Sequence, residues 1–401
     1  MATPNPKGIK AKELLAYLPL EMLESTALQT EVDKNVKKLF GKDMFLLLLM
    51  AVLDSERVSL RIMQDLYSNH KFQLLAGIEE NSTTRFTSIS DRLMNINVEY
   101  FEKIFEASYE KLSKQFSVSQ IEKHSIVRFD STSISASAKL LTFGMTNGIP
   151  NAKTQEHNVR QVKITIGFDG LFTRSANVFT DQKYLAEDLA LGEAITQYGA
   201  SKNSIVVFDR GLKKRTAFAK FTEQNKLFVT RINPTKNYQV IKTNGEIKSL
   251  KSASLEFISD EQVYLFHQDK RKLKVPFRLI KAKRKQDGQM LFFLSNMEDM
   301  DAASIADIYK SRWDIEVFFR FLKQELNLKH FASYSINGIK VMLYVLLIAA
   351  MLIMLYKKLN SIDSYKRAKL KFIQAIETEI TRMIVLICGG NPEATPYLNS
   401  S

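Results

Sequence analysis

The sequence predicts an α/β protein with a helical region at its amino-terminal end. Three observations support this fold class. Apolar residues recur at helical spacing through residues 1–120, alternating segments typical of strands follow between 121 and 296, and helical patterns return afterwards. With 401 residues, the chain is long enough for two or three domains and a large core.

Composition narrows the class further. The apolar fraction of 45% and the charged fraction of 25% are ordinary for a folded soluble protein. A single cysteine, Cys388, excludes an intramolecular disulfide, and the five histidines lack the spacing of a zinc site. A metal would therefore be held by oxygen ligands. The first residues lack the apolar core of a secretory signal, so we expect a cytoplasmic protein.

The helical region is expected to span residues 1–120. Residues 46–52 are densely apolar, and residues 98–112 show clear 3.6-residue spacing. The region has the size of a small helical DNA-binding region, although no pattern in it identifies a recognition helix.

Two buried strands are expected further along, each ending at an aspartate. Residues 125–130 end at Asp130, and residues 204–209 end at Asp209. Active-site groups gather at strand ends in α/β sheets, so both aspartates are candidates for chemistry. A lone aspartate at a strand end is more often a turn or cap residue.

Between these strands the pattern predicts a hairpin and a helix. Residues 159–168 alternate strongly and close at the turn signal Asp169-Gly170, and a returning strand covers 171–179. A helix is expected over 185–198.

Residues 212–297 are predicted to form a basic, β-rich insertion. Strand-like pieces separated by turn residues occur at 226–232, 238–242, 263–268, 274–282 and 290–295. Residues 210–285 hold 20 Lys and Arg against 6 Asp and Glu, a net charge of +14, while the rest of the chain has 37 of each. All the excess charge lies in this segment, which suits a polyanion such as nucleic acid. A solvated basic surface that keeps the protein soluble is the alternative.

The most informative pattern consists of Tyr309, Arg312, Glu316 and Lys323. On one continuous helix beginning near Asp301, they fall within about 60° of one another at about 100° per residue. A phenol, a carboxylate and two cations on one stripe suit a metal and a run of phosphates. Taken alone, the stripe is equally compatible with a structural role.

Glu316 and the two aspartates form a set of three carboxylates from distant segments. Such a set can hold two Mg²⁺ ions about 3.5–4 Å apart, an arrangement used for phosphoryl transfer, and Mn²⁺ accepts the same ligands. We therefore expect Asp130, Asp209 and Glu316 to be the catalytic residues and the metal ligands, within reach of one metal site.

Residues 341–356 form the longest apolar run. Its 16 residues fall short of the roughly 20 that span a bilayer, so we expect a buried core helix over 338–357 and no membrane. Residues 389–401 are expected to form a loose tail.

Taken together, these motifs resemble the bacterial insertion-sequence transposases of the DDE class, in the insertion-sequence-four family. The family signature Y-x-x-R-x-x-x-E-x-x-x-x-x-x-K is matched at every spacing by Tyr309, Arg312, Glu316 and Lys323. The family's first aspartate lies in Asp-Ser/Gly-Thr, as in Asp130-Ser131-Thr132, and its second in Asp-Arg-Gly, as in Asp209-Arg210-Gly211. The resemblance covers roughly residues 120–360.

The resemblance implies an RNase H-like catalytic core interrupted by the β-rich insertion. The core would cover 121–211 and 298–388, with the insertion at 212–297 between its two parts. The implied activity is cut-and-paste transposition by Mg²⁺-dependent DNA cleavage, through a hairpin on the transposon end, followed by strand transfer. The implied partners are transposon ends and target DNA, bound by a homodimer that associates with the nucleoid.

The same resemblance implies roles for the stripe and the basic residues. Arg312 and Lys323 would hold phosphates near the cut, and Tyr309 the terminal 5′-phosphate. Further DNA contacts are expected from the basic residues Arg210, Lys213, Lys214, Arg215, Lys283, Arg284 and Lys285.

One family feature has no clear counterpart. Some relatives use an aromatic residue of the insertion to hold a base that has left the stack, whereas the single tryptophan here, Trp313, lies in the signature helix. Tyr238, Tyr264 and Phe266 are the candidates, with strand packing as the alternative role of each.

Two rival functions stay open. A DDE-type nuclease, or an inactive DNA-binding derivative of a transposase, would keep the same motifs. A basic structural or membrane-associated protein is suggested by the apolar run, and the shortness of that run weakens it.

Overall fold

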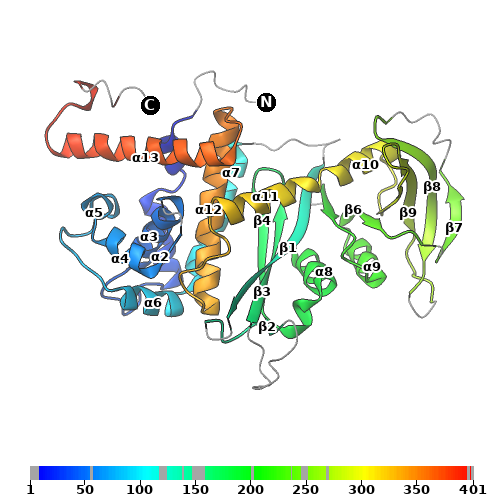
Figure 1. Cartoon of the computed structure of the whole chain (residues 1–401), viewed down its shortest axis with the longest axis horizontal. Coiled ribbons are helices and arrows are strands. Elements are labelled where there is room, and N and C mark those ends of the chain that lie inside the picture. Colours follow the sequence, from blue (N-terminus) through cyan, green and yellow to red (C-terminus); the bar gives the residue numbers. More distant parts are fainter. Residues whose placement is uncertain are drawn as a thin grey trace. The chain divides into compact units, whose positions relative to one another are not determined.

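The protein consists of two compact units, which Figure 1 draws in the colours of the sequence. The computed structural model describes residues 9–54, 57–116, 124–137, 140–146, 159–199, 203–235, 237–244, 252–267, 271–394 and 398. The first unit combines residues 1–117 with 320–401, and the second contains 118–319.

The first unit is helical. Its amino-terminal part contains α1 (Ala11–Leu15), α2 (Leu20–Thr30), α3 (Gly41–Asp54), α4 (Leu60–Tyr67), α5 (His70–Ala76), α6 (Phe86–Asn95) and α7 (Val98–Gln115). Its carboxyl-terminal part contains α12 (Ile336–Leu359), α13 (Tyr365–Ile387) and the short 3₁₀ helix η2 (Pro392–Ala394). The helical character predicted for residues 1–120 is confirmed over the residues that the structure describes.

Helix α12 forms the centre of this unit. It contacts α3, α6, α7 and α13. Within the described residues, it is the one helix long and apolar enough to cross a membrane, yet 89% of its most apolar stretch is buried. A helix that is apolar on all sides is stable in water when other helices surround it, so the predicted core helix is confirmed.

The second unit is built on one ten-stranded sheet. Its strands are β1 (Ser125–Ser137), β2 (Met145–Thr146), β3 (Val159–Phe168), β4 (Thr173–Phe179), β5 (Ser204–Phe208), β6 (Leu227–Ile232), β7 (Tyr238–Thr243), β8 (Leu255–Leu265), β9 (Phe277–Arg284) and β10 (Met290–Ser295). Their order is β2-β3-β1-β5-β6-β10-β9-β8-β7, with β4 paired to β3. The β1–β5 and β5–β6 pairs are parallel, and the other pairs are antiparallel.

Different helices cover the two faces of the parallel strands. Helices α8 (Glu187–Gln197) and α9 (Arg215–Glu223) pack on one face, against Phe129 and Phe208. Helix α10 (Ala302–Lys310) packs on the other, against Val207. Because successive side chains of a strand point to opposite faces, Asp130 and Asp209 point to the face that carries α10.

The predicted hairpin is confirmed between β3 and β4. The Oδ1 atom of Asp169 accepts hydrogen bonds from the amides of Leu171 (3.0 Å) and Phe172 (2.7 Å). Gly170 has a φ of 104°, which glycine adopts without steric cost.

Strand β1 is longer than predicted. It continues past Asp130 to Ser137, because β3 pairs with it in antiparallel register as far as Ser137 opposite Val159. The parallel pairing of β1 with β5 is shorter and stops at Phe129 opposite Phe208. The sequence had suggested that Asp130 ends its strand, and this prediction is wrong because Asp130 lies within β1.

The region 212–297 is not uniformly β-rich. Residues 215–223 form helix α9, and β6 pairs in parallel with β5, as a further strand of the core sheet. Strand β10 pairs with β6, so the later strands extend the same sheet. A helix with Phe218 and Phe221 on one face was missed because its apolar residues are few and the segment is strongly charged.

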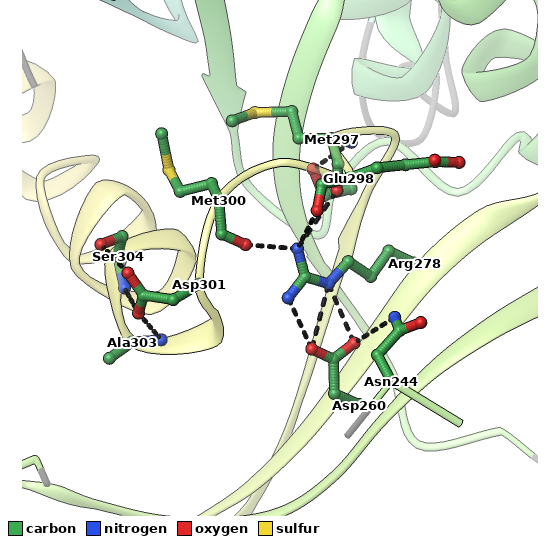
Figure 2. Close-up of polar contacts among 10 residues, drawn as sticks. Asn244, Asp260, Arg278, Met297, Glu298, Met300, Asp301, Ala303 and Ser304 are labelled. Atoms are coloured by element: carbon green, nitrogen blue, oxygen red, sulfur yellow. Dashed lines mark hydrogen bonds and ion pairs between the residues drawn. The ribbon is translucent and has the colours of Figure 1, made fainter. Parts of the chain in front are cut away.

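A buried ion pair joins two strands of this extension (Figure 2). Arg278 of β9 donates from Nε to Oδ1 of Asp260 on β8 at 2.9 Å and from Nη2 to Oδ2 at 2.5 Å. Asn244 donates to the same carboxylate at 3.0 Å. Both charged residues are buried, and each compensates the charge of the other.

The same arginine anchors the segment that leads into α10 (Figure 2). Its Nη1 atom donates to the carbonyl oxygens of Met297, Glu298 and Met300. Asp301 then caps the helix, since its Oδ1 accepts from the amides of Ala303 (2.8 Å) and Ser304 (2.9 Å). The extension of the sheet thereby sets where α10 begins.

Candidate active site

Asp130 and Asp209 lie side by side. The parallel register places Phe129 opposite Phe208, so the aspartates that follow them are neighbours on one face of the sheet. The Oδ1 atom of Asp130 accepts from the amide of Ser131 at 2.8 Å, and the Oδ1 atom of Asp209 accepts from the amide of Gly211 at 2.7 Å.

Negative charge gathers at the pair. Burial, together with the charges of Asp209 and Glu187, raises the pKa of Asp130 to about 6 against the opposing effects of the Ser131 amide and Arg312. A buried carboxylate beside other carboxylates is stabilised by a cation. The donor set is all oxygen, which fits Mg²⁺ or Mn²⁺.

A further carboxylate, Glu187, lies at this pair. It begins α8, and a Cβ atom built on Gly211 would lie 2.7 Å from Oδ1 of Asp209 and 3.2 Å from Oε2 of Glu187. The two carboxylates thus flank Gly211 closely, and this position has room only for glycine. Glu187 was not predicted as a site residue. Acidic residues are common in the first turn of a helix, where they interact favourably with the helix dipole.

Glu316 is connected to the aspartates through Arg312. The Nη2 atom of Arg312 donates to Oε1 of Glu316 at 2.6 Å, and the charge of Arg312 acts on Asp130. Throughout the described part of the chain, no three His, Cys, Asp or Glu side chains are gathered closely enough to hold a metal ion. Glu316 is paired with Arg312 here, and the metal site of Asp130, Asp209 and Glu316 stays a prediction.

The predicted continuous helix is also wrong. Helix α10 ends at Lys310 and α11 (Trp313–Gln324) begins at Trp313, with a tight turn over Ser311 and Arg312. In this turn the amide of Arg312 donates to the carbonyl of Tyr309 at 3.0 Å, three residues back.

Arg128 explains the break. It lies on β1, two residues before Asp130 and on the same face, and its Nε atom donates to the carbonyl oxygen of Ser311 at 2.9 Å. Its Nη2 atom pairs with Oδ2 of Asp314 at 3.1 Å. The Ser311 carbonyl is thus drawn toward the sheet, and Arg312 is fixed beside the aspartates. No sequence pattern had singled out this arginine.

Tyr309 lies against the sheet on the same side. Its ring meets Phe293 edge-on at 5.6 Å between centroids, and the guanidinium carbon of Arg231 lies 5.7 Å from its centroid. Burial raises the pKa of its hydroxyl, while Arg312 and Arg231 oppose that shift. Lys323 lies in the last turn of α11, in the part of that helix that belongs to the first unit.

The other basic residues predicted to contact DNA differ in whether their side chains are exposed or bonded within the protein. Arg210, Lys213, Lys214 and Lys283 are exposed. Arg215 is committed internally, since its guanidinium donates to the carbonyls of Asn237 (3.0 Å) and Phe266 (2.8 Å). Arg284 pairs with Asp287 at 3.2 Å, and Lys285 donates to the carbonyl of Ser252 at 2.8 Å.

The candidate aromatic residues of the extension have partners of their own. Lys281 lies over the ring of Tyr238 at 5.0 Å, and Lys272 over that of Tyr264 at 4.5 Å. Phe266 forms an isolated bridge with Lys272. Trp313, in contrast, is 55% exposed at the start of α11.

The mixed sheet carries two neighbouring aspartates with Arg312 beside them, an arrangement that fits chemistry on phosphate groups. The family can be named as well. The model of the transposase DDE domain matches residues 121–352, and the chain belongs to this family.

Individual relatives carry similar names. The chain is 31% identical to a Sinorhizobium fredii protein named for a transposase, y4zB, over 39% of this chain and 43% of the relative. It is 28% identical to a Geobacillus stearothermophilus protein named for the transposase of insertion sequence element IS5377, over 48% of each. The chain thus spans about half the length of these two relatives. A Synechocystis protein named for the IS4SA transposase is 23% identical over 82% of this chain and 85% of its own length.

A solved structure is also similar in part. The synaptic complex of piggyBac transposase with hairpin DNA aligns over 96% of this chain and 83% of that one, at 10% identity and a TM-score of 0.44. That score is too low to compare details.

Proposed function

We propose that this protein is the transposase of an insertion sequence in the insertion-sequence-four family. It cleaves DNA at the ends of its element and joins the freed 3′ ends to target DNA, with a hairpin on the transposon end as the intermediate. The family membership and the names of the relatives support a transposase. The Y-x-x-R-x-x-x-E-x-x-x-x-x-x-K signature supports the narrower family.

The proposed catalytic core is RNase H-like. Its support is the order β4-β3-β1-β5-β6, in which an antiparallel hairpin flanks β1 and two parallel strands follow on the other side. Strands β7 to β10 then form the insertion, directly before the signature segment that begins with α10.

The observation that carries the proposal is the adjacency of Asp130 and Asp209, with Arg312 linking them to Glu316. The repulsion between the aspartates fits a divalent cation, and Asp130, Asp209 and Glu316 would hold it. When bound, Mg²⁺ supplies Lewis acidity at the reacting phosphate and activates the attacking hydroxyl.

The protein's own side chains would perform the remaining work. Arg312 binds the phosphate with its planar fork and so releases Glu316 from the ion pair seen here. Tyr309 holds a neighbouring phosphate through its hydroxyl, and Lys323 contributes a point charge. Binding of DNA and completion of the carboxylate set would therefore be coupled.

Bulk attraction to DNA would come from the basic segment 210–285, with its net charge of +14. Such binding depends steeply on salt, because bound cations are released from the DNA. Two ends have to be paired for excision, so a homodimer is the proposed active form. The protein would act in the cytoplasm, on the nucleoid.

One observation favours a second candidate. Glu316 is held by Arg312 and no set of three carboxylates is gathered among the described residues, as expected for a derivative that binds DNA without cutting it.

Cleavage of the DNA that flanks the protein's own gene separates the two. With Mg²⁺ we expect nicked and hairpin products at the borders of the element. Asp130→Asn, Asp209→Asn and Glu316→Gln should each lower this cleavage by about a thousandfold or more, while DNA binding stays within a few-fold of wild type. Unchanged cleavage by any of the three would contradict the assignment, and DNA binding without cleavage by the wild type would establish the inactive derivative.

A further inference from the structure

Arg231 lies at the edge of the proposed active site without an assigned role. It is the residue after Thr230, which β6 places opposite Phe208 of β5. Since Asp209 follows Phe208, Arg231 and Asp209 are neighbours in register and point to the same face of the sheet. The hydroxyl of Thr230 also donates to the carbonyl of Asp209 at 3.2 Å, which holds the two strands together at this point.

The guanidinium of Arg231 is held in place by an aromatic face. It lies 5.7 Å from the centroid of the Tyr309 ring, which is itself packed edge-on against Phe293. A cation near the face of a tyrosine ring is attracted by the negative charge of that face, and this attraction uses none of the guanidinium N–H donors.

No acceptor takes up those donors. Within the described residues, Arg231 makes no side-chain hydrogen bond and no ion pair, and its Nε atom is buried without a partner. A buried donor without an acceptor is unfavourable, and an external group that accepts from it would relieve this cost.

Like charges surround this arginine. Arg210, Arg284 and Arg312 all act on it, and together with burial they lower the pKa of its guanidinium. Arg284 and Arg312 have carboxylate partners at 3.2 Å and 2.6 Å, whereas Arg231 has none among the described residues. A half-buried, unpaired cation among other cations is stabilised when an anion joins them.

We propose that Arg231 binds a DNA phosphate, as the sheet-side half of a clamp whose helix side is Tyr309 and Arg312. The ligand is a single phosphodiester or terminal phosphate of the strand that lies beside Asp209. This inference rests on the proposed function, because it takes DNA to be the ligand.

Arg231 would add a phosphate contact from the sheet, which Tyr309 and Arg312 cannot provide. Tyr309 and Arg312 approach from the α10–α11 turn, while Arg231 approaches from β6. A phosphate between them would be gripped from two elements, which fixes its position better than one row on one helix.

The test is a scan of DNA phosphates by binding in EDTA, without cleavage. The probe is a duplex spanning one border of the protein's own gene, in versions that each carry one neutral methylphosphonate. In wild type, neutralising the clamped phosphate should weaken binding by about tenfold. In Arg231→Gln the same replacement should weaken binding by only about threefold, because the contact with Arg231 is already lost while those with Tyr309 and Arg312 remain. The slope of binding against salt should fall by about one.

Lys183→Gln is the matched control. It removes one positive charge that lies over a tyrosine ring, at 4.7 Å from the centroid of Tyr184, and it lies outside the basic segment 210–285. Its methylphosphonate profile should equal that of wild type. Arg231→Lys keeps the charge without the planar fork, and should show intermediate sensitivity if Arg231→Gln fails to fold.

The outcomes separate the two proposals. If Arg231→Gln and Arg231→Lys keep the wild-type sensitivity at every phosphate, the phosphate clamp is overturned. If the profile changes as expected but wild type does not nick this DNA with Mg²⁺, the clamp stands and the cleaving transposase is overturned. If wild type does not bind the duplex, both are overturned.

Discussion

Two arginines of the same sheet, Arg278 and Arg231, have opposite surroundings. Arg278 reaches Asp260 and three backbone carbonyls, so every part of its guanidinium is satisfied (Figure 2). Arg231 lies against the ring of Tyr309 with its Nε atom buried and unpartnered within the described residues. The difference teaches that a buried cation with protein acceptors is part of the scaffold, whereas one without them marks a place for an external anion.

Replacing Arg278, whose hydrogen bonds are all made within the protein, should have the largest effect on stability. Arg278→Met leaves Asp260 charged and unpaired, and should lower the free energy of unfolding by about 3–5 kcal/mol, measured by urea denaturation. Replacing both partners, with Asp260→Leu and Arg278→Met, should recover most of the loss, because no buried charge is then left alone. Equal losses in the single and double variants would show that packing, and not the ion pair, stabilises this region.

Removing the unpaired negative charge at the active site should raise stability. Asp130→Asn should increase the free energy of unfolding at pH 7 by about 3 kcal/mol in the absence of metal, because the pKa of Asp130 is raised to about 6 by burial. Between about pH 4 and 6 the folded protein binds more protons at this site than the unfolded chain, so the wild type loses stability as pH rises. The advantage of the variant should accordingly vanish below about pH 4.

Thermal unfolding across pH checks this result. Asp301→Asn is the control, because hydrogen bonds from the Ser304 hydroxyl and the Ala303 amide lower the pKa of the Asp301 carboxyl. That change should destabilise the protein. A destabilised Asp130→Asn at pH 7 would mean that the aspartate is compensated and needs no cation.

Arg128 should combine structural and functional effects. Arg128→Met removes one of the two donors to the Ser311 carbonyl, the other being the amide of Asp314, and it also removes the ion pair with Asp314, so it should cost about 1–2 kcal/mol of stability. Cleavage should fall by at least about tenfold because Arg312 loses its fixed position, while affinity for DNA changes little. Arg174→Met, at the neighbouring arginine, should leave cleavage near the wild-type rate. Equal cleavage by both variants would remove the positioning role of Arg128.

The smallest stability effect is expected at the unsatisfied arginine. Arg231→Gln should change the free energy of unfolding by no more than about 0.5 kcal/mol, because no protein acceptor is lost. Thermal melting of this variant beside Arg278→Met gives the contrast directly. A loss at Arg231 as large as at Arg278 would place Arg231 in the scaffold instead of in a phosphate clamp.

Much of the fold could be predicted from local patterns. The Asp169-Gly170 hairpin, the helices of the amino-terminal region and the core helix α12 follow from turn chemistry and periodicity, which act over a few residues. The break between α10 and α11 could not be predicted, because it depends on Arg128, which lies 183 residues before the Ser311 carbonyl that it binds. The missed helix α9 has too few apolar residues for its period to stand out.

By itself, the sequence determined which residue types carry the chemistry and where the positive charge lies. Asp130, Asp209, Glu316 and their neighbours belong to short motifs, and short motifs are readable without a structure. Only the tertiary structure decided how these residues meet. The parallel register sets Asp130 beside Asp209, the approach of α8 adds Glu187, and the end of β6 brings Arg231 to Tyr309. Each of these contacts depends on strand order and helix packing over long separations, which local patterns do not contain.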